Sequence, residues 1–231
     1  MKRVGHKGAD LVAPGNTAAS FEAALEAGVD MIEFDVLRLR DGRIVLAHDY
    51  DDAGRREPMT LEEGLDHFAG EAYSDVELDI DMKLPGYERE VVDGVTSRGL
   101  ADRTLISSHY LQSLDEVALL APDIPRGLSV PRVRRDYMRS PLAVPAYAMA
   151  RWMRARLPGR IAQLMRAGRI HAVMSHWLLV SPRLVEVARA AGGEVYVWTV
   201  DDAKHIQRLS ALGVDGVITN DPRLFRLAGS G

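Results

Sequence analysis

The chain has 231 residues and a formal net charge of −4, and 47% of its side chains are apolar, 27% charged and 6% aromatic. This apolar fraction excludes a disordered chain, and the absence of cysteine excludes disulfides, zinc–thiolate sites, iron–sulfur clusters and a cysteine nucleophile. The length is enough for one large domain or two small ones with a sizeable core.

Short apolar runs typical of β-strands alternate with helical patterns along the chain. The runs lie near residues 3–6, 29–36, 43–48, 76–82, 103–107, 126–130, 170–175, 194–200 and 214–219. Helix N-cap signals fall between them at Asn16 or Thr17, at Thr60, at Ser181, and at Asp201 or Asp202. Strand–helix alternation over this length predicts an α/β fold, and specifically a (βα)8 TIM barrel.

Nine strand runs are one more than a (βα)8 barrel needs, and a hairpin accounts for the extra run. Asp41-Gly42 is a strong hairpin signal, and the link from residue 36 to 43 is too short for a helical crossover. A two-residue turn predicts the pairs Arg40–Arg43, Leu39–Ile44, Leu37–Leu46 and Asp35–His48. We therefore expect an irregular barrel with a β-hairpin extension after the second strand.

Two acidic side chains share one face of the second strand. Glu33 and Asp35 are two residues apart, so they point the same way, and the predicted register places His48 beside them. Two unpaired carboxylates would repel each other and raise each other's pKa. A hard divalent cation removes this conflict, and oxygen ligands suit Mg²⁺ or Ca²⁺.

A second polar group ends another strand, with Asp79, Asp81 and Lys83 on one face. His6 ends the first strand in the same way. Each feature alone has a structural explanation: a solvated face, a barrel ion pair or a buried core histidine. Together at several strand ends they indicate an active site, because burying so many charges without a ligand is costly.

At these residues the sequence resembles the glycerophosphodiester phosphodiesterases, within the phospholipase C-like phosphodiesterase superfamily. The matching segments cover most of the chain outside 131–169. They are His6-Lys7-Gly8, Pro14-Gly15-Asn16-Thr17, Glu33-Phe34-Asp35-Val36, Asp41-Gly42, His48-Asp49, Asp81-Met82-Lys83, Ser107-Ser108, Trp198-Thr199-Val200 and Gly213-Val214-Asp215-Gly216-Val217-Ile218-Thr219-Asn220. Four positions depart from the family pattern: Lys7 stands for Arg, Gly15 for Glu, Asp81 for Glu, and Asn220 for Asp.

The resemblance implies a TIM barrel and a role for each of several positions. It gives Glu33, Asp35 and Asp81 as metal ligands, His6 and His48 as the acid/base pair, and Lys7, Lys83 and Trp198 as substrate-binding residues. The implied cofactor is Mg²⁺ or Ca²⁺, and the partner is a small-molecule phosphodiester.

The function that follows is hydrolysis of glycerophosphodiesters to sn-glycerol 3-phosphate and an alcohol. The sequence leaves open whether a glycerol hydroxyl or water attacks the phosphorus. Two alternatives remain: a phospholipase D-like enzyme acting on lysophospholipids, and a phosphate-ligand binding barrel with little or no turnover. Residues 1–231 are expected to form a single barrel domain, with 131–169 as a basic helical insertion.

Residues 131–169 contain ten Arg and a single acidic residue, Asp136, so this stretch carries +9 and the remainder −13. The sequence predicts a helix from Pro145 to Leu157 with a Trp among Arg and Met residues. Such a helix could lie on anionic lipid, but a barrel helix with solvated Arg residues is the favoured interpretation. Nucleic acid is not expected as a partner, because the positive charge is local and aromatic residues are few. No signal segment or long apolar run is visible, which predicts a cytoplasmic protein.

Overall fold

Nine β-strands form one sheet in the computed structural model, which describes residues 1–132 and 143–228, with the backbone alone for 143–148 and 150. The strands are β1 (Lys2–His6), β2 (Met31–Arg38), β3 (Ile44–Val45), β4 (Glu77–Met82), β5 (Thr104–Ser108), β6 (Arg126–Val130), β7 (Ala172–His176), β8 (Glu194–Trp198) and β9 (Gly216–Thr219). Their order is β1-β9-β8-β7-β6-β5-β4-β2-β3, and β1 also pairs with β2. Eight of these strands therefore close into a parallel barrel, and the predicted TIM-barrel fold is confirmed.

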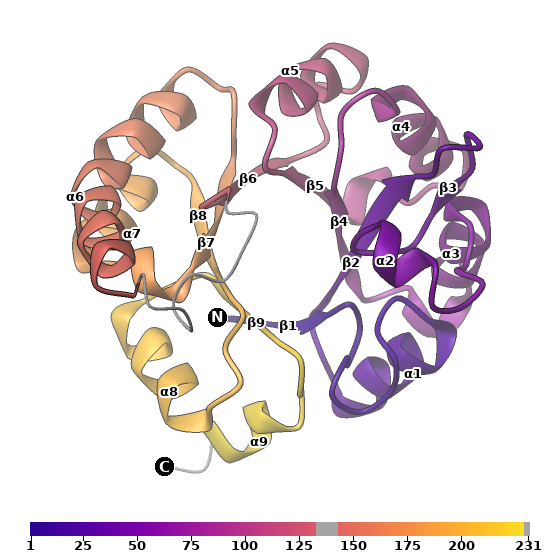
Figure 1. Cartoon of the computed structure of the whole chain (residues 1–231), viewed down its shortest axis with the longest axis horizontal. Coiled ribbons are helices and arrows are strands. Elements are labelled where there is room, and N and C mark those ends of the chain that lie inside the picture. Colours follow the sequence, from indigo (N-terminus) through magenta and orange to yellow (C-terminus); the bar gives the residue numbers. More distant parts are fainter. Residues whose placement is uncertain (133–142, 229–231) are drawn as a thin grey trace.

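Helices surround the ring of strands, as Figure 1 shows. The α-helices of the described residues are α1 (Ala18–Ala27), α2 (Tyr50–Ala53), α3 (Leu61–Phe68), α4 (Glu88–Ser97), α5 (Leu111–Leu120), α6 (Ala143–Arg166), α7 (Pro182–Ala190), α8 (Ala203–Leu212) and α9 (Leu224–Ala228). The predicted N-caps are in place: the side chains of Thr17, Thr60, Ser181 and Asp202 each accept a backbone hydrogen bond from the first turn. Local capping thus fixes where the helices between the strands begin.

The predicted hairpin after β2 forms, but its register was wrong by one residue. Leu37 pairs with Val45 and Arg38 with Ile44, and the backbone N–H of Leu39 donates to the carbonyl of Arg43. The turn therefore has three residues instead of two, with Gly42 in the left-handed region at φ +93°. The expected pairing of Asp35 with His48 does not occur, because β3 ends at Val45 and the chain then pairs with residues 59 and 60.

The inside of the barrel changes from apolar to polar along the strands. A small cluster of buried apolar side chains fills the lumen: Val4, Met31, Leu105, Ala172, Met174, Tyr196 and Ile218. Since inward-facing positions recur every second residue, the next inward residues after Val4 and Met31 are His6 and Glu33. The polar layer therefore lies at the carboxyl ends of the strands, where TIM-barrel enzymes place their active sites.

The basic stretch predicted for residues 131–169 contains α6, and residues 133–142 of that stretch lie outside the described part of the chain. Helix α6 runs from Ala143 to Arg166, longer than the predicted Pro145–Leu157, and connects β6 to β7. Its apolar side packs into the core through Leu157, Ile161, Leu164 and Met165, while Arg151, Arg154, Arg156 and Arg160 are exposed. Among the described residues, no helix is both long and apolar enough to cross a membrane.

Candidate active site

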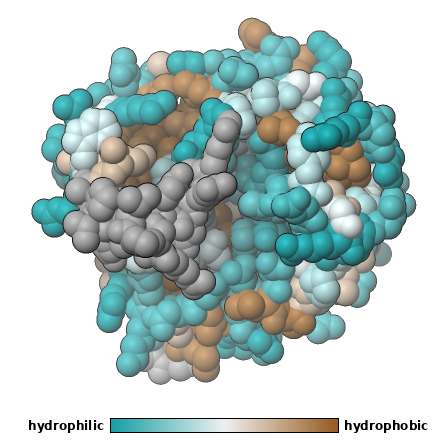
Figure 2. Space-filling model, viewed as in Figure 1, coloured by the Kyte–Doolittle hydropathy of each residue, from teal (hydrophilic) through white to brown (hydrophobic). Residues whose placement is uncertain are grey.

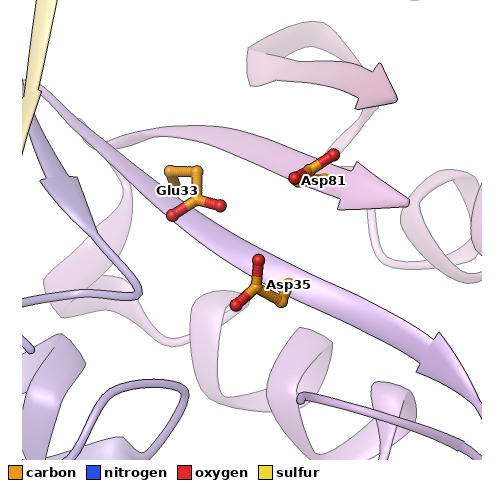
Figure 3. A group of neighbouring side chains, drawn as sticks. All are labelled: Glu33, Asp35 and Asp81. Carbon is orange, nitrogen blue, oxygen red and sulfur yellow. The ribbon is translucent and has the colours of Figure 1, made fainter. Parts of the chain in front are cut away.

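Three buried carboxyl groups converge from two neighbouring strands at the mouth of the barrel. Glu33 and Asp35 lie on β2, and the register pairs Asp35 with Asp81 on β4. One carboxylate oxygen from each of the three lies within 4.8 Å of the others. Figure 3 shows the three side chains on these two strands. The structure thus brings together the three residues that the sequence pattern predicted as metal ligands.

Lys83 is the cation that lies against this cluster. Its Nζ contacts the carboxylate of Asp35 and lies 2.5 Å from Asp81 Oδ2. Burial works to raise the pKa of Asp35, but the charge of Lys83, together with smaller contributions from His48, Lys7 and His6, outweighs burial and lowers that pKa below its ordinary value. Burial and the neighbouring Asp35 carboxylate instead raise the pKa of Glu33 well above its ordinary range.

The donors of the cluster fit a hard divalent cation. With all three carboxyl groups ionised, as the ligands of a cation are, the cluster and Lys83 together carry a net charge of −2, and Asp81 Oδ1 is buried without a hydrogen-bond partner among the described residues. A buried oxygen without a donor is costly unless something else satisfies it. Oxygen-only ligands of this kind suit Mg²⁺ or Ca²⁺.

Asn16 holds one of these carboxylates in place. It is fully buried with φ at +57°, its Nδ2 donates to Asp35 Oδ2 at 2.9 Å, and its Oδ1 accepts the backbone N–H of Asp35 at 3.0 Å. Asn tolerates the left-handed region better than most residues, which allows this tight turn before α1. The two hydrogen bonds fix the rotamer of Asp35 toward the cluster.

His6 lies at the edge of the cluster, at the end of β1. Its Nε2 is 3.9 Å from Glu33 Oε2, and its Nδ1 is 2.5 Å from Asn220 Oδ1. Burial, followed by the nearby Lys7 charge, lowers the pKa of His6. The backbone N–H of Lys7 donates to Glu33 Oε2 at 2.9 Å, while its ammonium pairs with Asp10 at 3.2 Å. Lys7 and His6 therefore both adjoin Glu33.

His48, which the resemblance implies as the second member of the acid/base pair, lies close to solvent. About half of its side chain is exposed (52%), and its Nδ1 is 3.1 Å from Asp49 Oδ2. Because the hairpin register differs from the predicted one, His48 reaches this position through the turn that begins α2, where its backbone N–H donates to Asp52. It is still close enough to Asp35 for its charge to help lower the pKa of that carboxyl group.

Trp198 lies across the barrel mouth, at the end of β8. Its indole N–H donates to the carbonyl of Met174 at 2.7 Å, and its ring contacts His176 and His109 at centroid distances of 5.1 and 6.3 Å. In Figure 1, β8 lies on the left of the ring and β2 and β4 lie on the right. Trp198 is thus part of an aromatic wall opposite the carboxylates. Hydrophilic residues dominate the centre of this face, to the right of the grey atoms in Figure 2.

A family model for the glycerophosphoryl diester phosphodiesterase family matches residues 6–63 and 53–224. The chain belongs to this family. It is accordingly a phosphoric diester hydrolase, and the predicted family is confirmed. The matched segments include every residue of the cluster described above.

Related proteins match this chain over almost its whole length. A glycerophosphodiester phosphodiesterase of Caldanaerobacter subterraneus is 29% identical over 95% of this chain and 93% of its own length. The crystal structure of a glycerophosphodiester phosphodiesterase from Parabacteroides distasonis superposes with a TM-score of 0.76 and 20% identity, over 99% of this chain and 97% of the other. A phosphodiesterase of Oleispira antarctica, solved in complex with the product sn-glycerol-3-phosphate, gives a TM-score of 0.72 and 20% identity, over 100% and 97%. These structural likenesses establish the barrel fold.

Sequence reasoning missed several residues that contact the site. Asn16 and Asn220 lie in the matching motifs, but Asn16 was interpreted only as a candidate helix N-cap, and Asn220 was given no role. Asp201 was read only as part of a helix cap, and Asp79 only as the start of a polar strand face. The available signal was the recurrence of amide side chains in the motifs at strand ends, which alone does not reveal what they contact.

Proposed function

We propose that this hydrolase is a divalent-metal-dependent glycerophosphodiester phosphodiesterase that releases sn-glycerol 3-phosphate and an alcohol. The observation that carries the proposal is the convergence of Glu33, Asp35 and Asp81, whose ligand atoms lie within 4.8 Å of one another. These three residues would hold the Mg²⁺ or Ca²⁺ ion. When bound, the ion would offset negative charge on the phosphoryl oxygens as it grows in the transition state.

Two lysines supply positive charge beside the carboxylates. Lys83 is buried, and although burial works to lower its pKa, Asp35 and Asp81 raise that pKa well above its ordinary value. It therefore remains an ammonium at neutral pH, and it can attract a phosphodiester at the cluster. Lys7 also keeps its charge, because Asp35 and Asp10 outweigh the effect of burial and raise its pKa.

The imidazoles of His6 and His48 are proposed to move the protons. A bond forms between phosphorus and the attacking oxygen while the bond to the leaving alcohol breaks. One imidazole takes the proton of the attacking hydroxyl, and the other gives a proton to the leaving oxygen. The attacker is either a hydroxyl of the glycerol part, which yields a cyclic phosphate that water then opens, or water itself. Trp198 is proposed to form a wall of the substrate site.

The relatives support this assignment of substrate. The related protein from Caldanaerobacter is named a glycerophosphodiester phosphodiesterase, and the neighbour from Oleispira binds sn-glycerol-3-phosphate as product. We further propose that residues 1–231 form one barrel domain, since α6 of the basic stretch occupies the connection between β6 and β7. The proposed partner is a small-molecule phosphodiester.

An activity panel tests the proposal. Purified protein is incubated with glycerophosphocholine, glycerophosphoethanolamine and glycerophosphoglycerol, with Mg²⁺, with Ca²⁺ and with EDTA, and the release of sn-glycerol 3-phosphate is measured. We expect turnover with at least one ion and none in EDTA. The variants His6→Ala and His48→Ala should each lower kcat by at least 100-fold, because a general acid or base contributes about that much. His67→Gln is the matched control, since His67 bonds to Tyr73 and packs against the rings of Phe21 on α1 and Phe68 on α3, away from the carboxylate cluster.

The same panel separates the alternatives. Lysophosphatidylcholine that loses choline while glycerophosphocholine stays intact would favour a phospholipase D-like enzyme. Tight binding of sn-glycerol 3-phosphate without turnover of any diester would favour a binding barrel. Near wild-type rates in both histidine variants would contradict the acid/base assignment.

A further inference from the structure

Three neighbouring strand ends are joined by hydrogen bonds next to His6. His6 ends β1, Asn220 follows β9 and Asp201 follows β8, and these strands are adjacent in the barrel. Asn220 Oδ1 lies 2.5 Å from His6 Nδ1, and Asn220 Nδ2 donates to Asp201 Oδ2 at 2.7 Å. Asp201 Oδ1 in turn accepts the backbone N–H of Asn220 at 2.8 Å and the hydroxyl of Thr219 at 3.0 Å.

The chemistry of these groups fixes the direction of every hydrogen bond in the chain. A carboxylate can only accept, so the amide nitrogen of Asn220 must face Asp201. The amide oxygen of Asn220 must therefore face the imidazole, and a carbonyl oxygen also only accepts. Nδ1 of His6 is consequently the protonated ring nitrogen. In the neutral ring this leaves a lone pair on Nε2, the atom that lies 3.9 Å from Glu33.

We propose that Asn220 and Asp201 are positioning residues that hold His6 in its Nδ1-protonated form with Nε2 free to accept a proton at the reaction centre. The proposal rests on the proposed function, in which His6 exchanges a proton with a reacting oxygen. It assigns His6 the part of proton acceptor in the first step, and His48 the part of donor. Without the Asn220 amide, the ring can rotate or change tautomer, and the fraction of molecules with a usable Nε2 falls.

The identities of residues 201 and 220 depend on each other. The resembled family motif has Asp at position 220, but in this chain an ionised Asp there would face the Asp201 carboxylate across 2.7 Å. Asp201→Asn alone would place two amide nitrogens against each other. The exchanged pair, Asp201→Asn with Asn220→Asp, restores the pattern, because the new amide at 201 donates to a carboxylate that still accepts from His6.

Steady-state kinetics on the diester that the wild type turns over fastest test the positioning role. We expect Asn220→Ala, Asn220→Asp and Asp201→Asn each to lower kcat by about 10- to 100-fold with KM changed less than about threefold, as loss of an orienting partner typically does. The exchanged double variant should regain kcat to within about fivefold of wild type. Asp202→Asn is the matched control: it removes a carboxylate from the same loop, where Asp202 only caps α8, and should leave kcat unchanged.

The ring itself provides a readout independent of activity. In ¹⁵N NMR spectra of the imidazoles, with His6 assigned through His6→Gln, the wild type should show a protonated Nδ1 and an unprotonated Nε2 for the neutral ring. Asn220→Ala should show a tautomer mixture. A wild-type ring protonated on Nε2 would overturn the proposal, as would a kcat of Asn220→Ala within twofold of wild type or a double variant no faster than the single ones. The wild-type spectrum does not depend on turnover, so failure of the proposed function is distinguishable from failure of this inference.

Discussion

Asp79 provides a measurable link between the buried acids of the barrel and the stability of the protein. It lies opposite Glu33 in the register, its side chain is almost fully buried, and its Oδ1 has no hydrogen-bond partner among the described residues. Burial raises the pKa of Asp79 to about 8, although a hydrogen bond from Ser107 opposes the shift. The charge of Asp81 adds to the increase. Asp79 therefore stays protonated in the metal-free protein at neutral pH.

The substitution Asp79→Asn keeps the shape of the side chain and removes its titration. An Asp in the unfolded chain titrates near pH 3.9. Between about pH 5 and pH 7 the folded wild type holds one proton that the unfolded chain has lost, so its free energy of unfolding falls as the pH rises. A raised carboxyl pKa thus gives stability that is present at low pH and is lost as the pH approaches 8. Over two pH units the loss relative to the variant is roughly 3 kcal/mol.

Urea denaturation at pH 5, 6 and 7 in EDTA measures this difference. We expect the free energy of unfolding of the wild type to fall relative to that of Asp79→Asn at each step, and the gap to level off above pH 8. Asp93→Asn, which removes an exposed carboxylate from α4, is the control and should follow the wild type. If the curves of the wild type and Asp79→Asn run parallel between pH 5 and pH 7, Asp79 is ionised and the argument from burial is wrong.

Three further predictions concern the ion, the barrel interior and the surface. Mg²⁺ or Ca²⁺ at 100 times its Kd should stabilise the wild type by about 3 kcal/mol, seen as a raised Tm, and Asp81→Asn should lose most of that shift. Gly216→Ala should lower the free energy of unfolding by about 1–3 kcal/mol in urea denaturation, because the added Cβ would lie 2.3 Å from the Tyr196 ring. Gly159→Ala on α6 is the control, since the added Cβ would have no atom within 4 Å, and it should not destabilise the protein. A barrel helix with solvated Arg residues predicts that the protein sediments no more with phosphatidylglycerol vesicles than with phosphatidylcholine vesicles; sedimentation specific to phosphatidylglycerol and reduced by Trp152→Ala, a side chain 55% exposed on α6, would contradict this.

The sequence was sufficient to predict those parts of the fold that depend on neighbouring residues. Strand and helix alternation and the helix N-caps at Thr60 and Ser181 are local patterns, and the structure contains each of them. The hairpin was predictable from Asp41-Gly42, but its register was not. A three-residue turn and a two-residue turn are both compatible with that dipeptide, and the choice between them moves every later residue to the opposite face.

The residues of the candidate site also fall into two groups: those whose positions follow from local sequence spacing, and those whose roles depend on contacts distant in sequence. Glu33 and Asp35 share a face because they are two residues apart, and parallel pairing of β2 with β4 brings Asp81 beside them. The roles of Asn16 and Asn220 depend instead on contacts between segments far apart in sequence. Asn16 bonds to Asp35, nineteen residues later on β2, and Asn220, near the other end of the chain, bonds to His6. No spacing rule connects such residues, so only coordinates can pair them.

Two departures from the family motif, Lys7 and Gly15, prove to be coupled through Asp10. Asp10 Oδ1 accepts the backbone N–H of Gly15 at 2.9 Å, and Asp10 Oδ2 pairs with the Lys7 ammonium at 3.2 Å. A Cβ at position 15 would lie 2.5 Å from Asp10 Oδ1 and 2.8 Å from the Cβ of Lys7, so the glycine leaves room for this carboxylate. Where the motif has Arg and Glu at positions 7 and 15, this chain has a Lys–Asp pair at positions 7 and 10. In this chain the carboxylate beside Lys7 therefore comes from Asp10, and the absence of a side chain at position 15 leaves room for it.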